Sequence, residues 1–434
     1  MSGIGSARNP FRWLSFPVKV SAVPPTAPGR LIAGLALLVL LSACAGPGTQ
    51  AGARPTPSAP TGSASPAESA TVAPTTAPPP STAPTTAPTA SGGTPSSAVA
   101  CSGPIPAGDN LVLGTVTGSA TVVLRDITNL SSPRNLCTFV GSIAPRFATA
   151  SVVGYTEQGS DLGSPGHITR LDLAAASATN LASWTTGGFG SGLFDWSPDG
   201  SALTYLAPGS PGPVWHLLSG GRDQVLATLP AVLGRGVSLE DDDFMVAFSP
   251  DGLYLALVET FATGGTGDSS PVQVRRASDG GLVYSAASGT MAVWASVPSR
   301  LFFRSAAGVL SRWDPSSGVS VLQSSLRWTR PHASPDGRWV AYTSYDSARH
   351  PHVSLYSVQG NSLRAVVSGL RSGAQFLNNN LLWYQEEAAC DCGLATSQTT
   401  GTAYLYDIAA NAESGSRLSG VFDAWPRVTA PPGF

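Results

Sequence analysis

A short phrase, Ser-Pro-Asp-Gly, recurs three times in this chain and constrains its fold more than any other feature. The copies occupy residues 197–200, 249–252 and 334–337, and each precedes a run of apolar and aromatic residues, such as residues 202–206. Pro presets φ for a turn, Asp and Ser can hydrogen-bond nearby backbone, and Gly adopts positive φ without steric cost. The phrase therefore predicts a tight turn that leads into a β-strand.

Four weaker copies extend the phrase into a series with a regular period. Aligned on the residue before the turn, the seven copies fall at Phe147, Trp196, Phe248, Trp294, Ala333, Phe376 and Trp425. The steps are 49, 52, 46, 39, 43 and 49 residues. A second marker, a strand that ends in Asp and a polar turn, has the same period from Asp126 to Asp407. Four short strands in each repeat of 40–50 residues are typical of β-propeller blades, and we expect the aromatic residues to pack between them.

The order of strands at the two ends of the repeats indicates how the ring closes. The repeat region begins with what resemble the second, third and fourth strands of a blade, at residues 110–115, 120–127 and 135–140. It ends with a lone first strand, at residues 421–428. Joining the two ends completes one blade. The sequence thus predicts an all-β, seven-bladed propeller over residues 101–434, or a six-bladed one if a weak repeat is an insertion.

The Ser-Pro-Asp-Gly phrase resembles the WD-like repeat of TolB-type propellers and of the propeller domain of prolyl oligopeptidases. The resemblance implies the propeller fold and, by analogy with TolB-like proteins, the binding of partner proteins in the cell envelope. No G-x-S-x-G elbow occurs in the chain, so the peptidase activity of the second family is not carried over. TolB-like proteins are soluble and have an additional N-terminal domain, which differs from the arrangement expected here, so their specific partners are not transferred.

An export signal is predicted at the start of the chain. Residues 31–41 form an apolar run after Arg30, which is too short to cross a bilayer and is typical of a signal peptide. Leu41-Ser42-Ala43-Cys44 follows and resembles the bacterial lipobox, in which the cysteine is diacylated and becomes the new N-terminus. Two acyl chains give stable anchoring. We therefore expect a signal peptide over 1–43 and a lipid anchor at Cys44 that holds the protein on the extracytoplasmic side of the cell membrane.

Residues 44–100 are predicted to be a disordered linker. From residue 45 to residue 100, only five residues are not Ala, Pro, Ser, Thr or Gly. Such a segment buries too little apolar surface to offset the entropy lost on ordering. The linker would therefore act as a tether between the lipid anchor and the folded domain.

Four further cysteines, Cys101, Cys137, Cys390 and Cys392, suggest disulfides outside the cytosol. Three pairings are possible. In the predicted topology Cys101 and Cys137 lie on one face of the disc, whereas Cys390 and Cys392 lie in a loop on the opposite face. We predict a Cys101–Cys137 disulfide and a small local ring at Cys390–Cys392, with a reactive Cys-x-Cys pair as the alternative for the latter.

The candidate binding site is the mouth of the central channel, which the innermost strands line and where propeller ligands often bind. Their polar residues are Arg146, Asp195, Asp243, Arg330, His332, Gln375 and Asp423. The alternative interpretation is a channel filled with water that bridges these groups. His350 and His352 offer two imidazoles, but no third metal ligand has a defined spacing, so we expect an ordinary surface loop there.

Charge and motif content narrow the functional classes. The chain beyond the signal peptide carries 20 basic and 26 acidic residues, a balance that disfavours nucleic acid as a partner. We find no trusted catalytic constellation and expect no cofactor. The sequence favours a monomeric, membrane-tethered propeller that docks a protein or an envelope polymer. The alternative is a lyase or hydrolase acting on a glycan or small molecule at the channel mouth, which requires several histidines and carboxylates to converge.

Overall fold

The folded part of the chain is built entirely from β-strands in the residues that the structure describes. The computed structural model describes residues 99–108, 110–115, 121–140, 143–158, 164–187, 192–229, 244–259, 272–286, 289–295, 299–305, 308–324, 326, 328–347, 350–366, 369–387 and 399–427. The chain divides into units 1–81 and 82–434, and every described residue belongs to the second. No helix that could span a membrane occurs among these residues.

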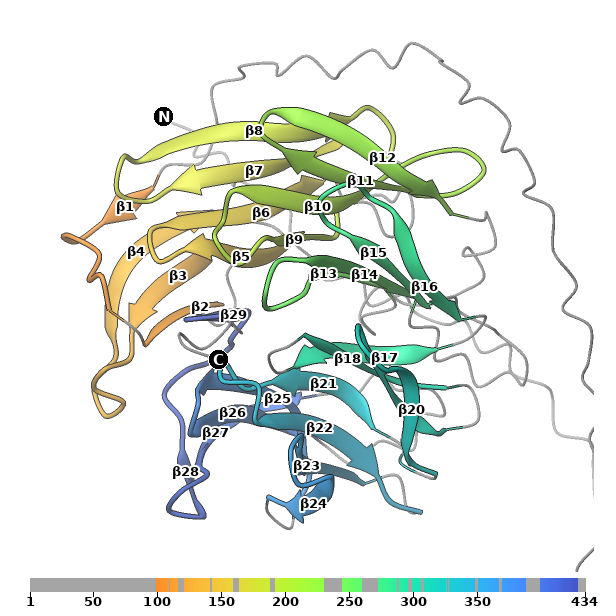
Figure 1. The fold of residues 1–434 in the computed structure, drawn as a ribbon. Coiled ribbons are helices and arrows are strands. Elements are labelled where there is room, and N and C mark those ends of the chain that lie inside the picture. The colour runs from red at the N-terminus through yellow and green to blue at the C-terminus, as the bar shows by residue number, and fades with distance from the viewer. Residues whose placement is uncertain are drawn as a thin grey trace, which may run out of the picture. The chain divides into compact units, whose positions relative to one another are not determined.

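The strands form seven antiparallel sheets, which are the blades of a propeller (Figure 1). Blade 1 contains β29 (Asp423–Trp425), β2 (Leu111–Thr115), β3 (Thr121–Asp126), β4 (Arg134–Val140) and β1 (Ala100–Cys101). Blade 2 contains β5 (Ile143–Thr149), β6 (Val152–Gln158), β7 (Gly166–Asp172) and β8 (Ser177–Trp184), and blade 3 contains β9 (Phe194–Trp196), β10 (Ala202–Ala207), β11 (Val214–Ser219) and β12 (Arg222–Thr228).

The remaining four blades repeat this order. Blade 4 contains β13 (Phe244–Phe248), β14 (Tyr254–Glu259), β15 (Val272–Arg276) and β16 (Leu282–Ala286), and blade 5 contains β17 (Thr290–Ala295), β18 (Arg300–Arg304), β19 (Leu310–Asp314) and β20 (Gly318–Gln323). Blade 6 contains β21 (Thr329–Ala333), β22 (Trp339–Tyr345), β23 (Pro351–Ser357) and β24 (Ser362–Ala365), and blade 7 contains β25 (Arg371–Asn378), β26 (Leu381–Glu387), β27 (Thr399–Asp407) and β28 (Ala412–Gly415).

The first strands of the blades contact one another in a closed circle, in the order β29, β5, β9, β13, β17, β21, β25 and back to β29. The strand β29 comes from the end of the chain and pairs with β2, so that Val112 lies opposite Ala424 and Leu113 opposite Asp423. The Asn110 N–H donates to the Trp425 carbonyl at 3.0 Å. The prediction of seven blades with a shared, composite blade 1 is thus confirmed.

Two details of blade 1 differ from the sequence prediction. Strand pairing places Ala424, and not Trp425, in the position that Trp196 holds in blade 3, because Ala424 faces Val112 as Trp196 faces Leu203. A fifth strand, β1, also pairs with the outer strand β4. An additional edge strand of two residues has no periodic signal, so the sequence did not reveal it.

The Ser-Pro-Asp-Gly phrase forms the same turn in all three copies. In the first, the Ser197 hydroxyl donates to the Asp199 carboxylate at 2.6 Å and accepts from the Ala202 N–H at 2.8 Å, while the Gly200 N–H donates to the Ser197 carbonyl at 2.8 Å. The second and third copies repeat these contacts within 0.2 Å. The serine is buried each time. The phrase therefore serves structure: each buried hydroxyl finds both a donor and an acceptor.

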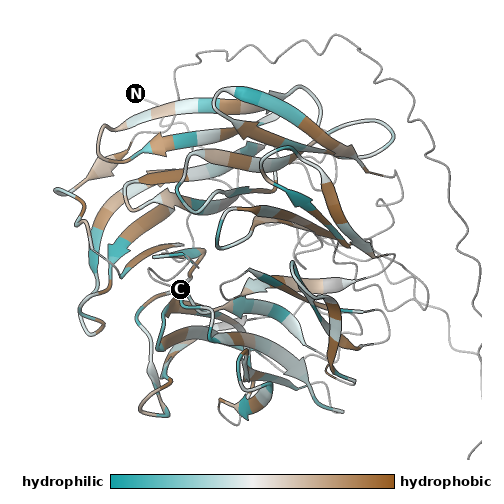
Figure 2. Cartoon of the chain, in the orientation of Figure 1, coloured by the Kyte–Doolittle hydropathy of each residue, from teal (hydrophilic) through white to brown (hydrophobic). Residues whose placement is uncertain are grey.

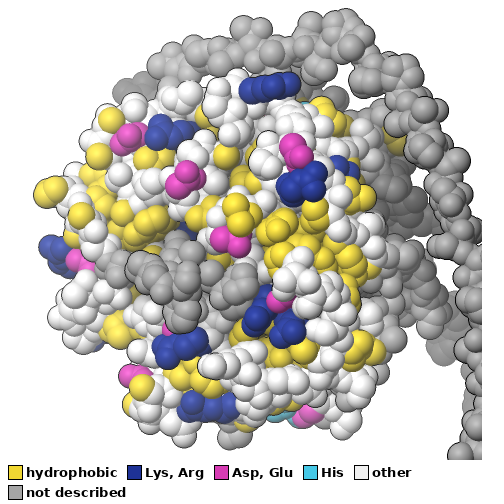
Figure 3. All heavy atoms as spheres, viewed as in Figure 1, with side chains coloured by type: hydrophobic (Ala, Val, Ile, Leu, Met, Phe, Trp, Pro, Cys, Tyr) yellow, Lys and Arg dark blue, Asp and Glu magenta, His cyan; other side chains and the backbone are white. Residues whose placement is uncertain are grey.

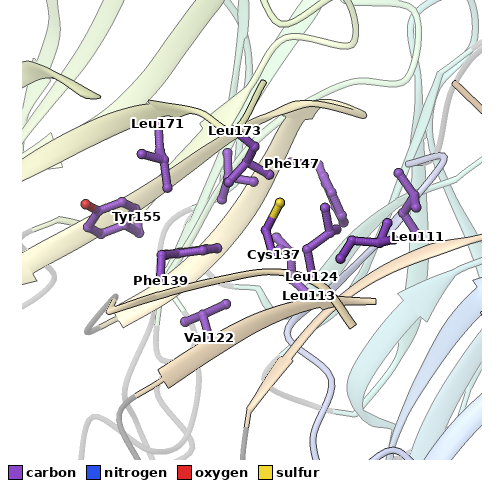
Figure 4. Packing of buried hydrophobic residues seen from close by; sticks show 12 residues of the cluster. Leu111, Leu113, Val122, Leu124, Cys137, Phe139, Phe147, Tyr155, Leu171 and Leu173 are labelled. Carbon is purple, nitrogen blue, oxygen red and sulfur yellow. The ribbon is translucent and has the colours of Figure 1, made fainter. Parts of the chain in front are cut away.

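The core lies between the blades: strands such as β2, β10 and β18 are buried along continuous runs, because both faces of a blade pack on its neighbours, and Figure 2 shows hydrophobic residues along these strands. Between blades 1 and 2, side chains from both sheets pack against each other, and the rings of Phe139 and Tyr155 lie 5.8 Å apart (Figure 4). The aromatic residues of the repeat series follow the same rule, and Phe147, Trp196 and Phe376 are all buried. They fill the wedges between blades, as predicted.

Cys101 and Cys137 form a disulfide, the pairing expected from the sequence. The physical reason differs from the one given above, because the two cysteines face each other directly as register partners of β1 and β4 at the outer edge of blade 1. The bond therefore fixes the start of the folded domain to the rim of the propeller. Cys44, Cys390 and Cys392 lie outside the described residues, so their predicted roles stay predictions.

The turn glycines provide a matched pair for testing blade packing. Gly200 and Gly252 have φ of +69° and +71°, which L-residues rarely adopt. A Cβ at Gly200 would lie 2.6 Å from the Ala148 carbonyl oxygen in blade 2, whereas at Gly252 the nearest atom is 3.4 Å away. We expect Gly252→Ala to lower the free energy of unfolding by about 1 kcal/mol and Gly200→Ala by clearly more. Urea denaturation measures both, and equal losses would contradict the packing of blades 2 and 3.

Candidate functional site

The innermost strands place one residue of each blade at the same level of the channel. Strand pairing identifies these equivalent positions as Asp423, Arg146, Asp195, Ala247, Val293, His332 and Gln375. We call this set the inner ring. Five of its seven members belong to the predicted binding site. Of the other two predicted residues, Arg330 lies two positions before His332, and Asp243 is outside the described residues.

Three inner-ring side chains accept hydrogen bonds from the backbone of the next blade. The Asp423 carboxylate accepts from the Phe147 N–H at 2.8 Å, and the Asp195 carboxylate accepts from the Phe248 N–H at 2.9 Å. His332 Nδ1 accepts from the Phe376 N–H at 3.2 Å. The innermost strand of a sheet has an unpaired edge whose N–H groups need acceptors. These side chains therefore join neighbouring blades, a structural role that the sequence did not indicate.

Arg427 is the channel residue that sequence reasoning missed. Its guanidinium forms an ion pair with Asp195 and donates to the carbonyls of Phe147 and Trp196, at 3.4 and 3.1 Å. Although burial opposes its charge, the carboxylates of Asp195 and Asp423 raise the pKa of Arg427, so the guanidinium stays charged. No strand periodicity could have indicated it, because β29 ends at Trp425 and Arg427 lies beyond the strand.

His332 is held in its neutral form. Burial lowers its pKa to about 4, and the positive charges of Arg146 and Arg427 act in the same direction. The hydrogen bond from Phe376 requires Nδ1 to be unprotonated, which assigns the proton of the neutral ring to Nε2. The Nδ1 lone pair of His332 is therefore already used, and it is available to neither a proton nor a metal ion.

Two cavities open along the channel. One, of about 210 Å³, lies toward the carboxyl ends of the innermost strands and is lined by Asp195, Asp423 and Arg427 among others. The other, of about 420 Å³, lies toward their amino ends and is lined by Arg330 and Gln375. Arg146 and His332 line both. We name them the carboxyl-end and amino-end cavities. The structure thus brings six of the seven predicted site residues together in one channel.

Charged groups outside the channel are dispersed on the described surface. On the face shown in Figure 3, basic and acidic side chains occur in small separate groups among polar and apolar ones. His350 and His352 both lie beside the Asp346 carboxylate, at 3.4 and 3.3 Å, on the exposed hairpin of blade 6. Within the described ranges, no group of three His, Cys, Asp or Glu side chains could hold a metal ion.

Comparisons with known proteins were made for the sequence and for the fold. No family model matches the chain, and no curated protein matches its sequence. Among solved structures, TolB from Acinetobacter baumannii is similar at 17% identity and a TM-score of 0.38, over 58% of this chain and 61% of that one. The propeller domain of the Trilobed protease from Pyrococcus furiosus is similar at 9% identity and a TM-score of 0.44, over 62% and 81%.

A third similar structure is the acylaminoacyl peptidase from Pyrococcus horikoshii, at 10% identity and a TM-score of 0.41, over 61% of this chain and 44% of that one. The matches therefore span less than two thirds of both the TolB chain and this peptidase. The seven-bladed ring itself rests on the strand pairing described above.

The neutral state of His332 predicts a pH dependence of stability. With a pKa of about 4 in the folded protein and about 6.5 in the unfolded chain, the unfolded state binds the proton more readily between these values. The free energy of unfolding should therefore fall as the pH decreases from about 6.5 to about 4, on the order of 2 kcal/mol from this group.

His332→Gln supplies the control, because its amide oxygen can still accept from Phe376 but does not titrate. Urea denaturation across this pH range should show a shallower loss for the variant than for the wild type. Identical pH profiles would show that His332 titrates alike in both states.

Proposed function

We propose that this protein is a lipid-anchored, extracytoplasmic binding protein whose propeller docks a partner protein or an envelope polymer at the mouth of its central channel. The observation that carries the proposal is the amino-end cavity, which combines apolar walls with a few polar side chains on strands of the innermost layer. Such concave, mostly apolar surfaces with convergent polar groups are the usual form of a binding site.

The scaffold around this mouth is rigid, which favours recognition. The lining residues lie on innermost strands that contact one another around the closed ring. The hydrogen bonds that Asp423 accepts from blade 2, Asp195 from blade 4 and His332 from blade 7 fix their relative positions. A binding site that is held in place before the partner arrives loses little conformational entropy on docking.

The carboxylates of Asp195 and Asp423 and the Nδ1 atom of His332 already accept hydrogen bonds in the structure. Asp195 has both an N–H donor and Arg427 as partners, Asp423 accepts from the Phe147 N–H, and His332 Nδ1 accepts from Phe376. A general acid needs a proton, and a general base needs a free lone pair, directed at the reacting group. Their present contacts therefore support a role in holding the binding surface and favour docking over turnover.

The predicted anchor suits a docking role. A flexible linker between Cys44 and the start of the described chain at Val99 would span on the order of 40 Å. The described chain enters the propeller through β1, which pairs with β4 at the outer edge of blade 1. The tether thus joins the rim, and it leaves the attachment point away from the innermost strands that line the channel.

Replacing the proposed anchor tests the location. In cells that make the full chain, Cys44→Ser should move the protein from the membrane fraction to the soluble fraction and abolish incorporation of labelled palmitate. Ser42→Ala, two residues away, keeps the cysteine and should leave both unchanged. A Cys44→Ser protein that still fractionates with the membrane and carries the label would overturn the anchor.

Site-specific crosslinking tests the docking surface. A photoreactive phenylalanine analogue would replace Phe422, which lines the amino-end cavity, or Val321, which is 65% exposed on the outer strand β20. In intact cells, we expect a discrete adduct from position 422 and none from position 321. Adducts only from the rim, the same adducts from both positions, or no adduct from 422 would each contradict docking at the channel mouth.

A further inference from the structure

The two channel cavities differ in charge. The carboxyl-end cavity contains Asp195 and Asp423 opposite Arg427, so its charges are largely compensated. The amino-end cavity is lined by Arg146 and Arg330, and no Asp or Glu occurs among its described lining residues. Arg146 also lines the carboxyl-end cavity beside Asp195 and Asp423, but on the amino-end side the only charged groups among the described lining residues are guanidinium groups and the imidazole of His332, which favours an anionic ligand group.

Arg146 is the stronger of the two candidates for contacting such a group. It lies on β5, and its side chain forms no hydrogen bond or ion pair with another residue in the described ranges. Arg330, in contrast, already has an interaction of its own and contributes positive charge to the same cavity. A partly enclosed guanidinium without a partner is unfavourable unless an anion or water occupies its donors.

The backbone around this cavity is strained in a repeated way. Met291, Arg330 and Gly373 occupy equivalent positions in blades 5, 6 and 7, two residues before the inner ring, and have φ of +51°, +49° and +65°. Only glycine adopts this region without penalty. A Cβ at Gly373 would meet no atom within 4 Å, so the space beside this position is open. Each of the three residues falls within a register shift of its innermost strand, so these irregular positions of the backbone lie at the cavity mouth.

The other residues that line the amino-end cavity indicate which chemical groups a ligand would carry beside its anion. The chain contains three methionines, and the two beyond the predicted signal peptide, Met245 and Met291, both line this cavity. Methionine adapts its shape to varied apolar groups. Gln375 lines the same cavity; its Oε1 is covered by protein atoms and has no hydrogen-bond donor in the described structure, so a rotation of the side chain would bring it to a ligand N–H. The site therefore offers a place for an anion, an N–H group and an apolar side chain.

We propose that the amino-end cavity binds the carboxyl-terminal residue of a partner polypeptide. The terminal carboxylate would contact Arg146, the N–H of the terminal peptide bond would donate to Gln375 Oε1, and the apolar side chain would pack against Met245 and Met291. This inference rests on the proposed docking at the channel mouth and specifies its ligand. An anionic polymer of phosphodiesters supplies neither the N–H nor the apolar group, so the lining favours a peptide.

Calorimetric titration of the purified full chain with small probes tests the assignment. N-acetyl-Leu-Phe with a free carboxylate should bind at least about tenfold more tightly than its C-terminal amide, as expected for loss of a charge-assisted contact. Two further probes separate other sources of negative charge: N-acetyl-Leu-Glu-amide carries a side-chain carboxylate, and glycerol 3-phosphate represents an anionic polymer.

Matched variants assign the contacts. Arg146→Gln should weaken the free acid about tenfold and leave the amide unchanged, whereas Gln375→Leu should weaken both, because both keep the N–H. Arg222→Gln makes the same chemical change at an exposed position on the outer strand β12 and should alter neither. Near-ultraviolet circular dichroism verifies that each variant is folded, and Arg146→Lys, which keeps the charge, should restore part of the preference for the free acid.

Several results would overturn the inference. Equal binding of acid and amide, or equal behaviour of Arg146→Gln and Arg222→Gln, would exclude a carboxylate contact at Arg146. Tighter binding of the glutamate probe would assign the anion to a side chain, and binding of glycerol 3-phosphate without the peptides would assign it to a polymer. If crosslinks from Phe422 form while every peptide fails, the docking surface stands and only the terminal carboxylate is wrong.

Discussion

The pairing of β29 with β2 is the interaction on which the rest of the structure depends. Each blade packs its two faces on neighbours, so an open ring would leave the apolar faces of two blades in water. The three-residue strand β29, near the end of the described chain, prevents this by completing blade 1. The Asp423 carboxylate then extends the connection to blade 2 through the Phe147 N–H. Ring closure thus combines strand pairing inside one blade with a side-chain bond to the next.

The same closure creates the channel and determines its chemistry. Closing the ring brings Asp423 and Arg427 from the end of the chain next to Asp195 and His332 from its middle. Buried charges of this kind are tolerated because each has a partner or a backbone donor. The carboxyl-end cavity is consequently occupied by contacts that hold the blades. Arg146 and Gln375 line the amino-end cavity.

The repeat period made the blades predictable, because each turn phrase uses local chemistry that recurs wherever Ser, Asp and Gly keep their spacing. The composite blade followed from counting strands at the two ends. Register was harder to predict. An alignment on aromatic residues selects Trp425, yet strand pairing places Ala424 at that position, and the Trp425 ring packs beside Phe147 at 6.1 Å. The site residues were found as a set because innermost strands must line the channel. Their division into blade-joining and available groups depends on contacts between distant blades, which no local pattern encodes.

Amide hydrogen exchange of the full chain, followed by mass spectrometry, tests ring closure most directly. If β29 is the innermost strand of blade 1, the amides of residues 423–425 should exchange as slowly as those of residues 111–113, because the two strands open only together. Rapid exchange of residues 423–425, at the rate of an unpaired chain end while residues 111–113 stay protected, would show that the ring is not closed by this strand.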